Sequence, residues 1–228
     1  MRLLDIFAAG MASLLVVSAF TTQTSSPSPS ELVRRHHEHG TFTNIYIMRQ
    51  GLDYSNGSLP VHNPDGSVAF LFDKVMRDYK NGISSTVVMN RNSNPLLQLK
   101  SQGDICKRKS YYIEPDVAGA THTRVEIDPR FWKADRWYFS FVAPSGEQFS
   151  YVFKRHYWDK GGEIFRERKG ENDQEVAKLE NQVRWEPWLT PRSTGTHTYT
   201  LSCTADSPVV GLVALMGLIM TRVHDCGL

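Results

Sequence analysis

Clusters of basic side chains are the residues of this chain best suited to chemistry, because lysine and arginine can hold phosphate groups. Near a charged membrane surface each such cation contributes about 1 kcal/mol to the binding of anionic lipids. Two clusters supply six candidate headgroup ligands: Lys107, Arg108, Lys109, Lys154, Arg155 and Lys160. A third cluster holds Arg166, Arg168 and Lys169, interleaved with glutamates. We interpret the third cluster as ordinary surface charge, which is also the alternative for the first two.

A histidine-rich run offers a second kind of chemistry. His36, His37 and His39 carry imidazoles, which suit copper, nickel and zinc. Cleavage after the dibasic pair Arg34-Arg35 would leave His36 as an amino-terminal chelating residue. The alternative, which we favour, is a solvated polar run at the beginning of the fold. We therefore expect no metal and no cofactor.

Signature motifs of enzymes are missing from the sequence. It has no GxSxG elbow, no HExxH, no P-loop and no GxGxxG turn. Acidic residues are plentiful, but the sequence alone gives no pair the separation of about 5–10 Å that glycoside chemistry needs. An active site would have to combine residues far apart in the chain, so we expect a non-enzymatic protein.

Aromatic residues are dense between Phe131 and Trp158 and have basic neighbours, a combination that could stack single-stranded nucleic acid. The net charge is only +2, which gives such binding no global electrostatic support. The alternation of Trp137, Phe139 and Phe141 instead fits a barrel strand. We expect core packing here and no nucleic-acid partner.

The first forty residues differ in composition from the rest. Residues 1–20 contain an uncharged, mostly apolar run that ends near Val17-Ser18-Ala19, which predicts a signal peptide. An uncleaved membrane anchor or a dispensable extension are the alternatives. Residues 21–40 are rich in Ser, Thr, Pro and His and predict a flexible linker. With a signal peptide the protein is secreted; without one it is cytoplasmic or peripheral to a membrane.

Two further features depend on that location. Asn56 begins an Asn-Gly-Ser acceptor sequence, which is glycosylated only in the secretory pathway and is otherwise a tight turn. Cys106, Cys203 and Cys226 are widely spaced and odd in number, so at most one disulfide can form. We interpret the three cysteines as structural or incidental thiols.

From Thr41 onward the chain reads as short β-strands separated by turn residues. About ten or eleven strands at spacings of 8–12 residues predict a barrel or sandwich. The expected strands are Thr41–Arg49, Val68–Phe72, Ile83–Met89, Leu96–Lys100, Ser110–Glu114, Thr121–Ile127, Trp137–Val142, Gln148–Lys154, Glu163–Arg168 and Thr196–Cys203. One stretch, Asn172–Trp185, has apolar residues at helical spacing among Glu, Lys and Gln, so its period predicts a short helix.

The end of the chain predicts a helix with no polar face. Residues 208–220 carry no charge, and a helix that is apolar all round must be enclosed on every side. The run is shorter than the roughly 20 residues of a usual membrane span, so we expect a helix over 207–222, capped by Asp206 or Ser207, inside the strands. Its expected core residues are Val209, Leu212, Leu215, Met216 and Ile219.

Three consecutive segments resemble a known family. Val68–Lys74 follows the turn Asp65-Gly66, Ile83–Met89 comes next, and the polar turn after it leads into Pro95-Leu96-Leu97. This order, with an apolar helix at the end, is similar to the tubby C-terminal-like superfamily, including its LURP-one-related and phospholipid scramblase-like branches. The resemblance implies one domain over 41–228, mainly β: a closed antiparallel barrel of about 12 strands around a hydrophobic C-terminal helix.

The resemblance also implies a function. A non-enzymatic binding module for anionic phospholipid headgroups at a membrane surface is the expectation, although the phosphoinositide-binding basic positions of tubby proteins have no counterpart that we can identify. Two alternatives remain: a secreted barrel that binds a small ligand or metal, and a structural or protein-interaction domain. The sequence names no protein partner.

Overall fold

Most of the barrel region is described in the computed structural model. The described residues are 41–55, 57–115, 122–130, 133–143, 145–189 and 194–227. The predicted signal peptide, linker and histidine run, and Asn56 of the acceptor sequence, lie outside these residues.

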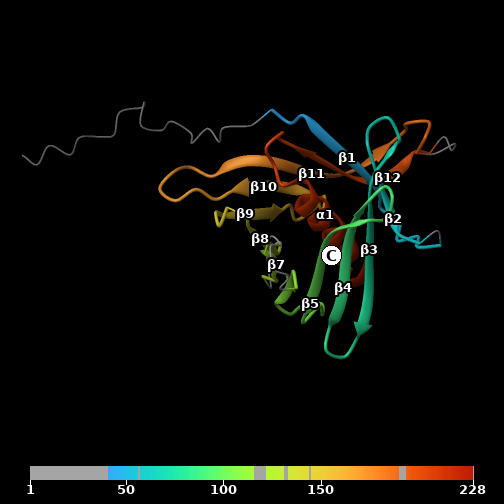
Figure 1. Cartoon of the computed structure of the whole chain (residues 1–228). Helices are drawn as coiled ribbons and strands as arrows, with labels where there is room; N and C mark the ends of the chain where they lie inside the picture. The colour runs from blue at the N-terminus through green and yellow to red at the C-terminus, as the bar shows by residue number, and fades with distance from the viewer. Residues whose placement is uncertain are drawn as a thin grey trace, which may run out of the picture. The chain divides into compact units, whose positions relative to one another are not determined.

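Twelve antiparallel strands close into a barrel, as the sequence predicts. They are β1 (Asn44–Arg49), β2 (Leu59–His62), β3 (Val68–Asp78), β4 (Ile83–Asn90), β5 (Pro95–Gln102), β6 (Ser110–Ile113), β7 (His122–Asp128), β8 (Arg136–Val142), β9 (Gln148–Arg155), β10 (Gly162–Arg166), β11 (Gln174–Arg184) and β12 (Thr196–Cys203). Each strand pairs with its neighbour in sequence, and β12 pairs with β1 from Asn44 opposite Cys203 to Arg49 opposite Thr198. The barrel therefore has no open edge (Figure 1).

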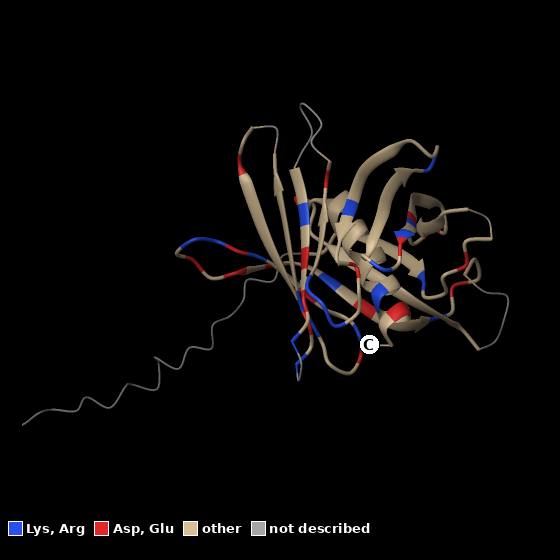
Figure 2. Ribbon diagram, turned by 90° about the horizontal axis from the view of Figure 1, so that it is seen from below, with Lys and Arg blue, Asp and Glu red and all other residues tan. Residues whose placement is uncertain are grey.

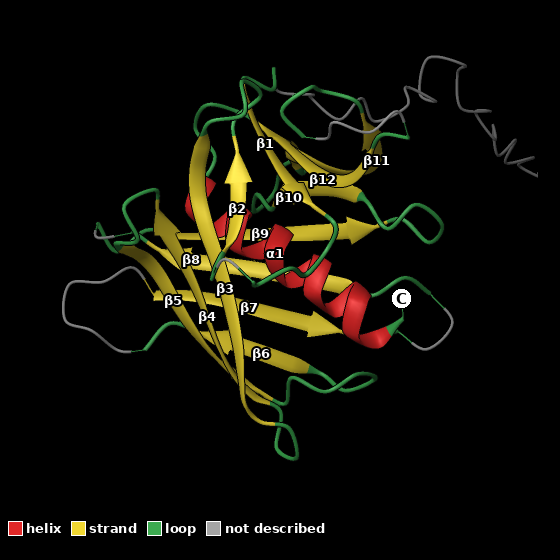
Figure 3. Cartoon of the chain, turned by 90° about the vertical axis from the view of Figure 1, so that its right-hand side faces the viewer, coloured by secondary structure: helices red, strands yellow, loops and turns green. Residues whose placement is uncertain are grey.

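A single helix, α1 (Val209–Cys226), runs through the barrel between β3 on one side and β9 on the other (Figure 3). Thirteen of its eighteen residues are buried. By length and composition it could cross a membrane, yet 72% of it is buried inside the protein. The expected core residues Leu212, Leu215, Met216 and Ile219 are at most 1% exposed, whereas Val209 is only partly buried.

Two glycines let the barrel wall approach the helix backbone. A Cβ atom on Gly211 would lie 2.3 Å from the ring of Phe139, and one on Gly217 would lie 2.3 Å from the ring of Phe72. Contacts between non-bonded carbon atoms have their optimum near 3.5–4.0 Å, so neither position has room for a side chain. The large aromatic residues of β3 and β8 fill the space that these glycines leave.

The predicted helix over Asn172–Trp185 is wrong, because this segment is β11. It pairs with β12 over Ala177–Arg184 and with β10 over Gln174–Leu179. A register shift opposite Ile164 and Phe165 marks a β-bulge, and Val176 and Leu179 both join the core. Their spacing of three residues therefore mimics a helical period, and the two strand ladders override the helix propensity of Glu, Lys and Gln.

Two smaller predictions also need correction. Strand β2 is not among the expected strands, since it is four residues long and contains a proline.

The predicted cap of α1 is the second correction. Pro208 occupies the N-cap of α1, and no side chain caps the helix. Asp206 accepts a hydrogen bond from Thr204 instead, and the Ser207 hydroxyl donates to the carbonyl of Val176. The helix start is thus fixed by the loop that leads into it.

Truncation of the helix core should cost much of the domain's stability. We expect Leu215→Ala to lower the free energy of unfolding by about 2–5 kcal/mol, because a buried leucine loses both its transfer free energy and its packing. Leu96→Ala is the matched control, since Leu96 is 46% exposed, and should change stability by less than about 1 kcal/mol. Urea unfolding of both variants measures the difference. Equal effects would place the helix outside the barrel.

Candidate functional site

One end of the barrel carries most of the predicted basic residues. Because neighbouring strands alternate in direction, the β5–β6, β7–β8 and β9–β10 connections leave the barrel at the same end, and α1 ends there too (Figure 3). We call this end the C-terminal rim. Lys107–Lys109 lie in the β5–β6 connection and Lys160 lies in the β9–β10 connection, whose base includes Lys154 and Arg155.

The six predicted headgroup ligands differ in how free they are to bind. Lys107 and Arg108 are exposed and make no ion pair with any described residue. Lys109 Nζ lies 2.7 Å from Glu126 Oε1. Lys154 pairs with Asp173 at 3.8 Å and lies over the ring of Phe165.

Arg155 has a structural role instead. Its Nε donates to Asp135 Oδ1 at 2.7 Å, and both side chains are 7% exposed. Asp135 also accepts from the indole of Trp137. A guanidinium held in this way cannot reach an external headgroup, so Arg155 leaves the set of candidate ligands.

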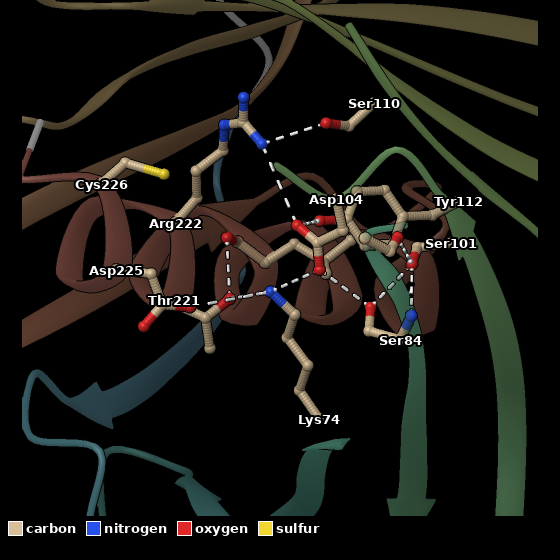
Figure 4. A network of polar contacts seen from close by, with 12 residues as sticks. Lys74, Ser84, Ser101, Asp104, Ser110, Tyr112, Thr221, Arg222, Asp225 and Cys226 are labelled. Atoms are coloured by element: carbon tan, nitrogen blue, oxygen red, sulfur yellow. Dashed lines mark hydrogen bonds and ion pairs between the residues drawn. The ribbon is translucent and has the colours of Figure 1, made fainter. Parts of the chain in front are cut away.

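A buried polar network holds the helix end to the wall of the barrel (Figure 4). Asp104 is its centre: Lys74 Nζ lies 3.0 Å from Oδ2, and Tyr112 and Ser84 each donate to the carboxylate. From the helix, Arg222 lies 4.0 Å from Asp104 and donates to Ser110 Oγ and to the carbonyl of Arg108. Two cations thus share one buried carboxylate.

The electrostatics of this network keep Asp104 ionised. Burial alone would raise the pKa of Asp104, but the charge of Lys74 and the hydrogen bonds from Tyr112, Lys74 and Ser84 outweigh it and hold that pKa below its usual value. Burial, together with the charge of Asp104, raises the pKa of Tyr112 well above its ordinary value. The phenol therefore stays protonated and remains a donor.

A disulfide fixes the same place covalently. Cys106 of the β5–β6 connection is bonded to Cys226 at the end of α1, which corrects the expectation of three thiols. Cys203 is free and buried, and burial raises the pKa of its thiol to about 11. The bond closes a sequence separation of 120 residues, a pairing that spacing alone does not indicate. The backbone that carries Lys107 and Arg108 is therefore anchored to the helix.

The β9–β10 connection is ordered by a histidine between two carboxylates. The two ring nitrogens of His156 lie 2.9 Å from Asp159 Oδ2 and 2.7 Å from Glu163 Oε1. Asp159 also accepts from the backbone of Gly161. Both ring nitrogens can donate only when the imidazole is protonated. Partial burial lowers the pKa of His156, but these two carboxylates outweigh it and raise that pKa above its usual value.

Two aromatic side chains stand out from this connection. Tyr157 is 60% exposed and Trp158 is 88% exposed, with their rings edge to face at 4.9 Å. The expectation of core packing holds for Trp137 and Phe139, which are at most 2% exposed, and is wrong for this pair. Their place in a turn, outside the strand alternation, is the sequence signal that could have indicated exposure.

Beside Trp158 the mouth of the barrel is hollow. Asn181 and Val183 of β11 and His197 of β12 share a face with the core residues Leu179 and Tyr199, because alternate residues of a strand point the same way. Together with the β9–β10 connection they bound an open hollow of about 540 Å³. Gln50 and Gln182 complete its polar lining. The helix end is held to β3 and to the β5–β6 connection rather than to the strands that line this hollow.

A second hollow of about 490 Å³ lies over β7, β8 and β9. Its lining holds the cations Lys109 and Arg124, and both pair with Glu126. Acidic and basic residues are likewise interspersed around the rim near the helix end (Figure 2). The two cations face three carboxylates among the lining residues, those of Glu126, Asp128 and Glu167, so this second hollow has no surplus of positive charge for an anionic ligand.

Within the described ranges, no group of three or more His, Cys, Asp or Glu residues could hold a metal ion. Searches against protein families, curated proteins and solved structures find no match to this chain. The candidate site therefore rests on its own geometry: an anchored basic connection, an exposed aromatic pair, and a polar hollow on one rim.

Removal of the central carboxylate should destabilise the helix end. We expect Asp104→Asn to lower the free energy of unfolding by about 3–5 kcal/mol, because Lys74 and Arg222 then lack their shared buried anion. The pKa of Asp104 is lower in the folded protein than in the unfolded chain. The ionised carboxylate therefore stabilises the fold above the unfolded pKa of about 3.9, and this stabilisation is lost as the pH falls through the folded-state pKa. Urea unfolding of Asp104→Asn and of the control Glu180→Gln, from a surface pair, measures it. A loss below about 1 kcal/mol, as expected for the control, would contradict this role.

His156 should titrate above its ordinary pKa. Because the folded-state pKa is raised, its contribution to stability is full below about pH 6.5 and is lost as pH rises through the folded value. An NMR titration of the ring protons should give a midpoint above about 6.5, and Glu163→Gln should move the midpoint back toward it. A wild-type midpoint at or below that value would show that the two carboxylates do not hold the ring.

Proposed function

We propose that the protein is a non-enzymatic module that binds anionic phospholipid headgroups through its C-terminal rim. The observation that carries the proposal is the exposed pair Tyr157 and Trp158 next to Lys160. On the same rim lie the exposed cations Lys107 and Arg108, which no described residue pairs with. Aromatic rings and basic residues in combination favour the interface between lipid headgroups and water.

The cations available for headgroups are three of the six that the sequence indicates. Lys107, Arg108 and Lys160 make no ion pair with a described residue, and each would contribute about 1 kcal/mol near an anionic surface. Lys109 and Lys154 contribute less, because each already has a carboxylate partner. Three cations alone give modest affinity, so the aromatic pair has to supply the rest.

The aromatic pair is placed to do so. An 88% exposed tryptophan leaves most of its apolar ring in water, and transfer of that ring into a membrane interface removes the cost of its hydration. His156 and its two carboxylates fix the turn beneath it. A preordered turn loses less conformational entropy on binding than a mobile one.

The helix restricts the site to the surface. Because α1 occupies the barrel interior, a ligand inside the barrel would have to displace the core. The two hollows described above open outward. Surface binding, rather than enclosure of an acyl chain, is the mode that this geometry supports.

The cellular setting is part of the proposal. The Cys106–Cys226 disulfide persists in oxidising compartments, which agrees with the predicted signal peptide. We propose that the protein is secreted or resides in the secretory pathway and meets anionic lipid there. Membership of the tubby C-terminal-like superfamily is likewise proposed, on the segment order and the barrel around its terminal helix.

Vesicle binding tests the function. We expect the protein to co-sediment with phosphatidylcholine vesicles that contain phosphatidylserine, and not with phosphatidylcholine alone, at low salt. The double variant Lys107→Glu/Arg108→Glu should weaken binding about 100-fold or more, because two attractive charges become repulsive. Arg91→Glu/Lys169→Glu is the matched control: it makes the same charge change in exposed turns of the opposite rim.

Equal loss in both double variants would show that overall charge, not the C-terminal rim, determines binding. Trp158→Ala should also weaken binding, while Leu96→Ala, an exposed apolar residue at the opposite rim, serves as its control. If the wild-type protein ignores phosphatidylserine vesicles at low salt, the proposed function is wrong.

A further inference from the structure

The hollow at the mouth of the barrel has the chemistry of a saccharide site. We propose that it binds a neutral pyranose ring, either of a free glycoside or of a glycolipid headgroup, with Trp158 as the stacking surface. This inference goes beyond the binding of anionic lipid, since a neutral sugar offers no charge to the basic residues of the rim.

Trp158 supplies one of the two contacts that a sugar needs. A pyranose ring has a face of C–H bonds that packs on an aromatic ring, and tryptophan offers the largest such surface. Trp158 is 88% exposed and lines the hollow rather than standing apart from it. Tyr157 meets it edge to face, which limits the orientations that the indole can adopt.

Amide side chains supply the other contact. Gln50, Asn181 and Gln182 line the hollow, and an amide carries both donors and an acceptor. The amide of Gln182 already donates to Thr200 Oγ1, so Gln50 and Asn181 are the two that we assign to the sugar. Vicinal hydroxyl groups of a sugar also donate and accept, so planar amides match them without requiring a charge. His197 adds a further polar group from β12.

Charge balance selects a neutral ligand. Among the described residues that line the hollow, Asp159 and Lys160 carry a fixed charge, and their signs are opposite. A volume of about 540 Å³ lies within the range of about 300–1,000 Å³ that is usual for small-molecule sites. An anionic or cationic ligand would gain little here, whereas a polyhydroxylated ring fits both the size and the polarity.

An unsatisfied polar group lies buried next to one of the residues that line the hollow. The hydroxyl of Tyr199, opposite Asn181 in register, is fully buried. Its interaction with the side chain of Asn181 lowers the pKa that burial raises, yet no partner among the described residues meets hydrogen-bond geometry. Asn181 is thus both a lining residue of the hollow and the cross-strand neighbour of this buried hydroxyl.

Two ligand sources are tested separately. Methyl glycosides of glucose, galactose and mannose probe free sugar, by tryptophan fluorescence and by NMR shifts of the Asn181 and Gln50 side-chain amides. Phosphatidylcholine vesicles with and without galactosylceramide probe a lipid headgroup that carries no net charge. We expect at least one glycoside or the glycolipid to shift these amides and to bind saturably.

Matched variants separate this site from the anionic-lipid site. Trp158→Ala and Asn181→Ala should each weaken sugar binding by about tenfold or more, while Leu96→Ala, at the opposite rim, and Lys107→Glu/Arg108→Glu should leave it unchanged. Asn181→Ala should retain binding to phosphatidylserine vesicles. Amide shifts with a glycoside but no glycolipid binding would assign the site to free sugar.

No saturable binding of any glycoside or of the glycolipid would overturn this inference and leave the proposed function standing. The same holds if Trp158→Ala and Leu96→Ala lose sugar binding equally. Conversely, sugar binding without affinity for phosphatidylserine would overturn only the proposed function.

Discussion

Enclosure of an apolar helix is the constraint on which this structure depends. A helix without a polar face must be covered all round, and a barrel of eight strands has an interior that side chains alone fill. Twelve strands leave room for α1, and Gly211 and Gly217 let the aromatic rings of the wall reach its backbone. The number of strands, the closure of β12 onto β1 and the absence of side chains at those two positions all follow from that need.

The same constraint decides where function can lie. When the interior of a barrel is filled, a ligand can bind only on its outer surface or at its two ends. The proposed site lies at one of these ends, the C-terminal rim. On one side the Asp104 network and the Cys106–Cys226 disulfide hold the helix end against the wall. On the other side the mouth stays open beside Trp158. One rim thus combines a rigid anchor, a basic connection and a polar hollow, which is why both proposals concern this rim.

The sequence predicted the fold well and the site only in part. The alternation of apolar and polar residues in the strands and the uncharged run before Thr221 are local sequence patterns. The strands of the barrel and its terminal helix could therefore be predicted from the sequence. Strand β11 was misread because a bulge gave Val176 and Leu179 a helical spacing that only the pairing partners explain. Arg155 looked like a headgroup ligand, since its partner Asp135 lies 20 residues away. The disulfide, the open mouth and the exposure of Trp158 are likewise properties of residues brought together by folding, which composition and spacing do not encode.

Hydrogen exchange with and without phosphatidylserine vesicles tests the central claim most directly, because it reports on the enclosed helix and on the rim in one measurement. The account predicts that amides of Gly211–Val223 exchange as slowly as the most protected strands in both conditions. Vesicles should slow exchange in residues 103–109 and 156–161 and leave the opposite rim unchanged. Rapid exchange in the helix would contradict its enclosure, and unchanged exchange in both connections would contradict the role of the rim.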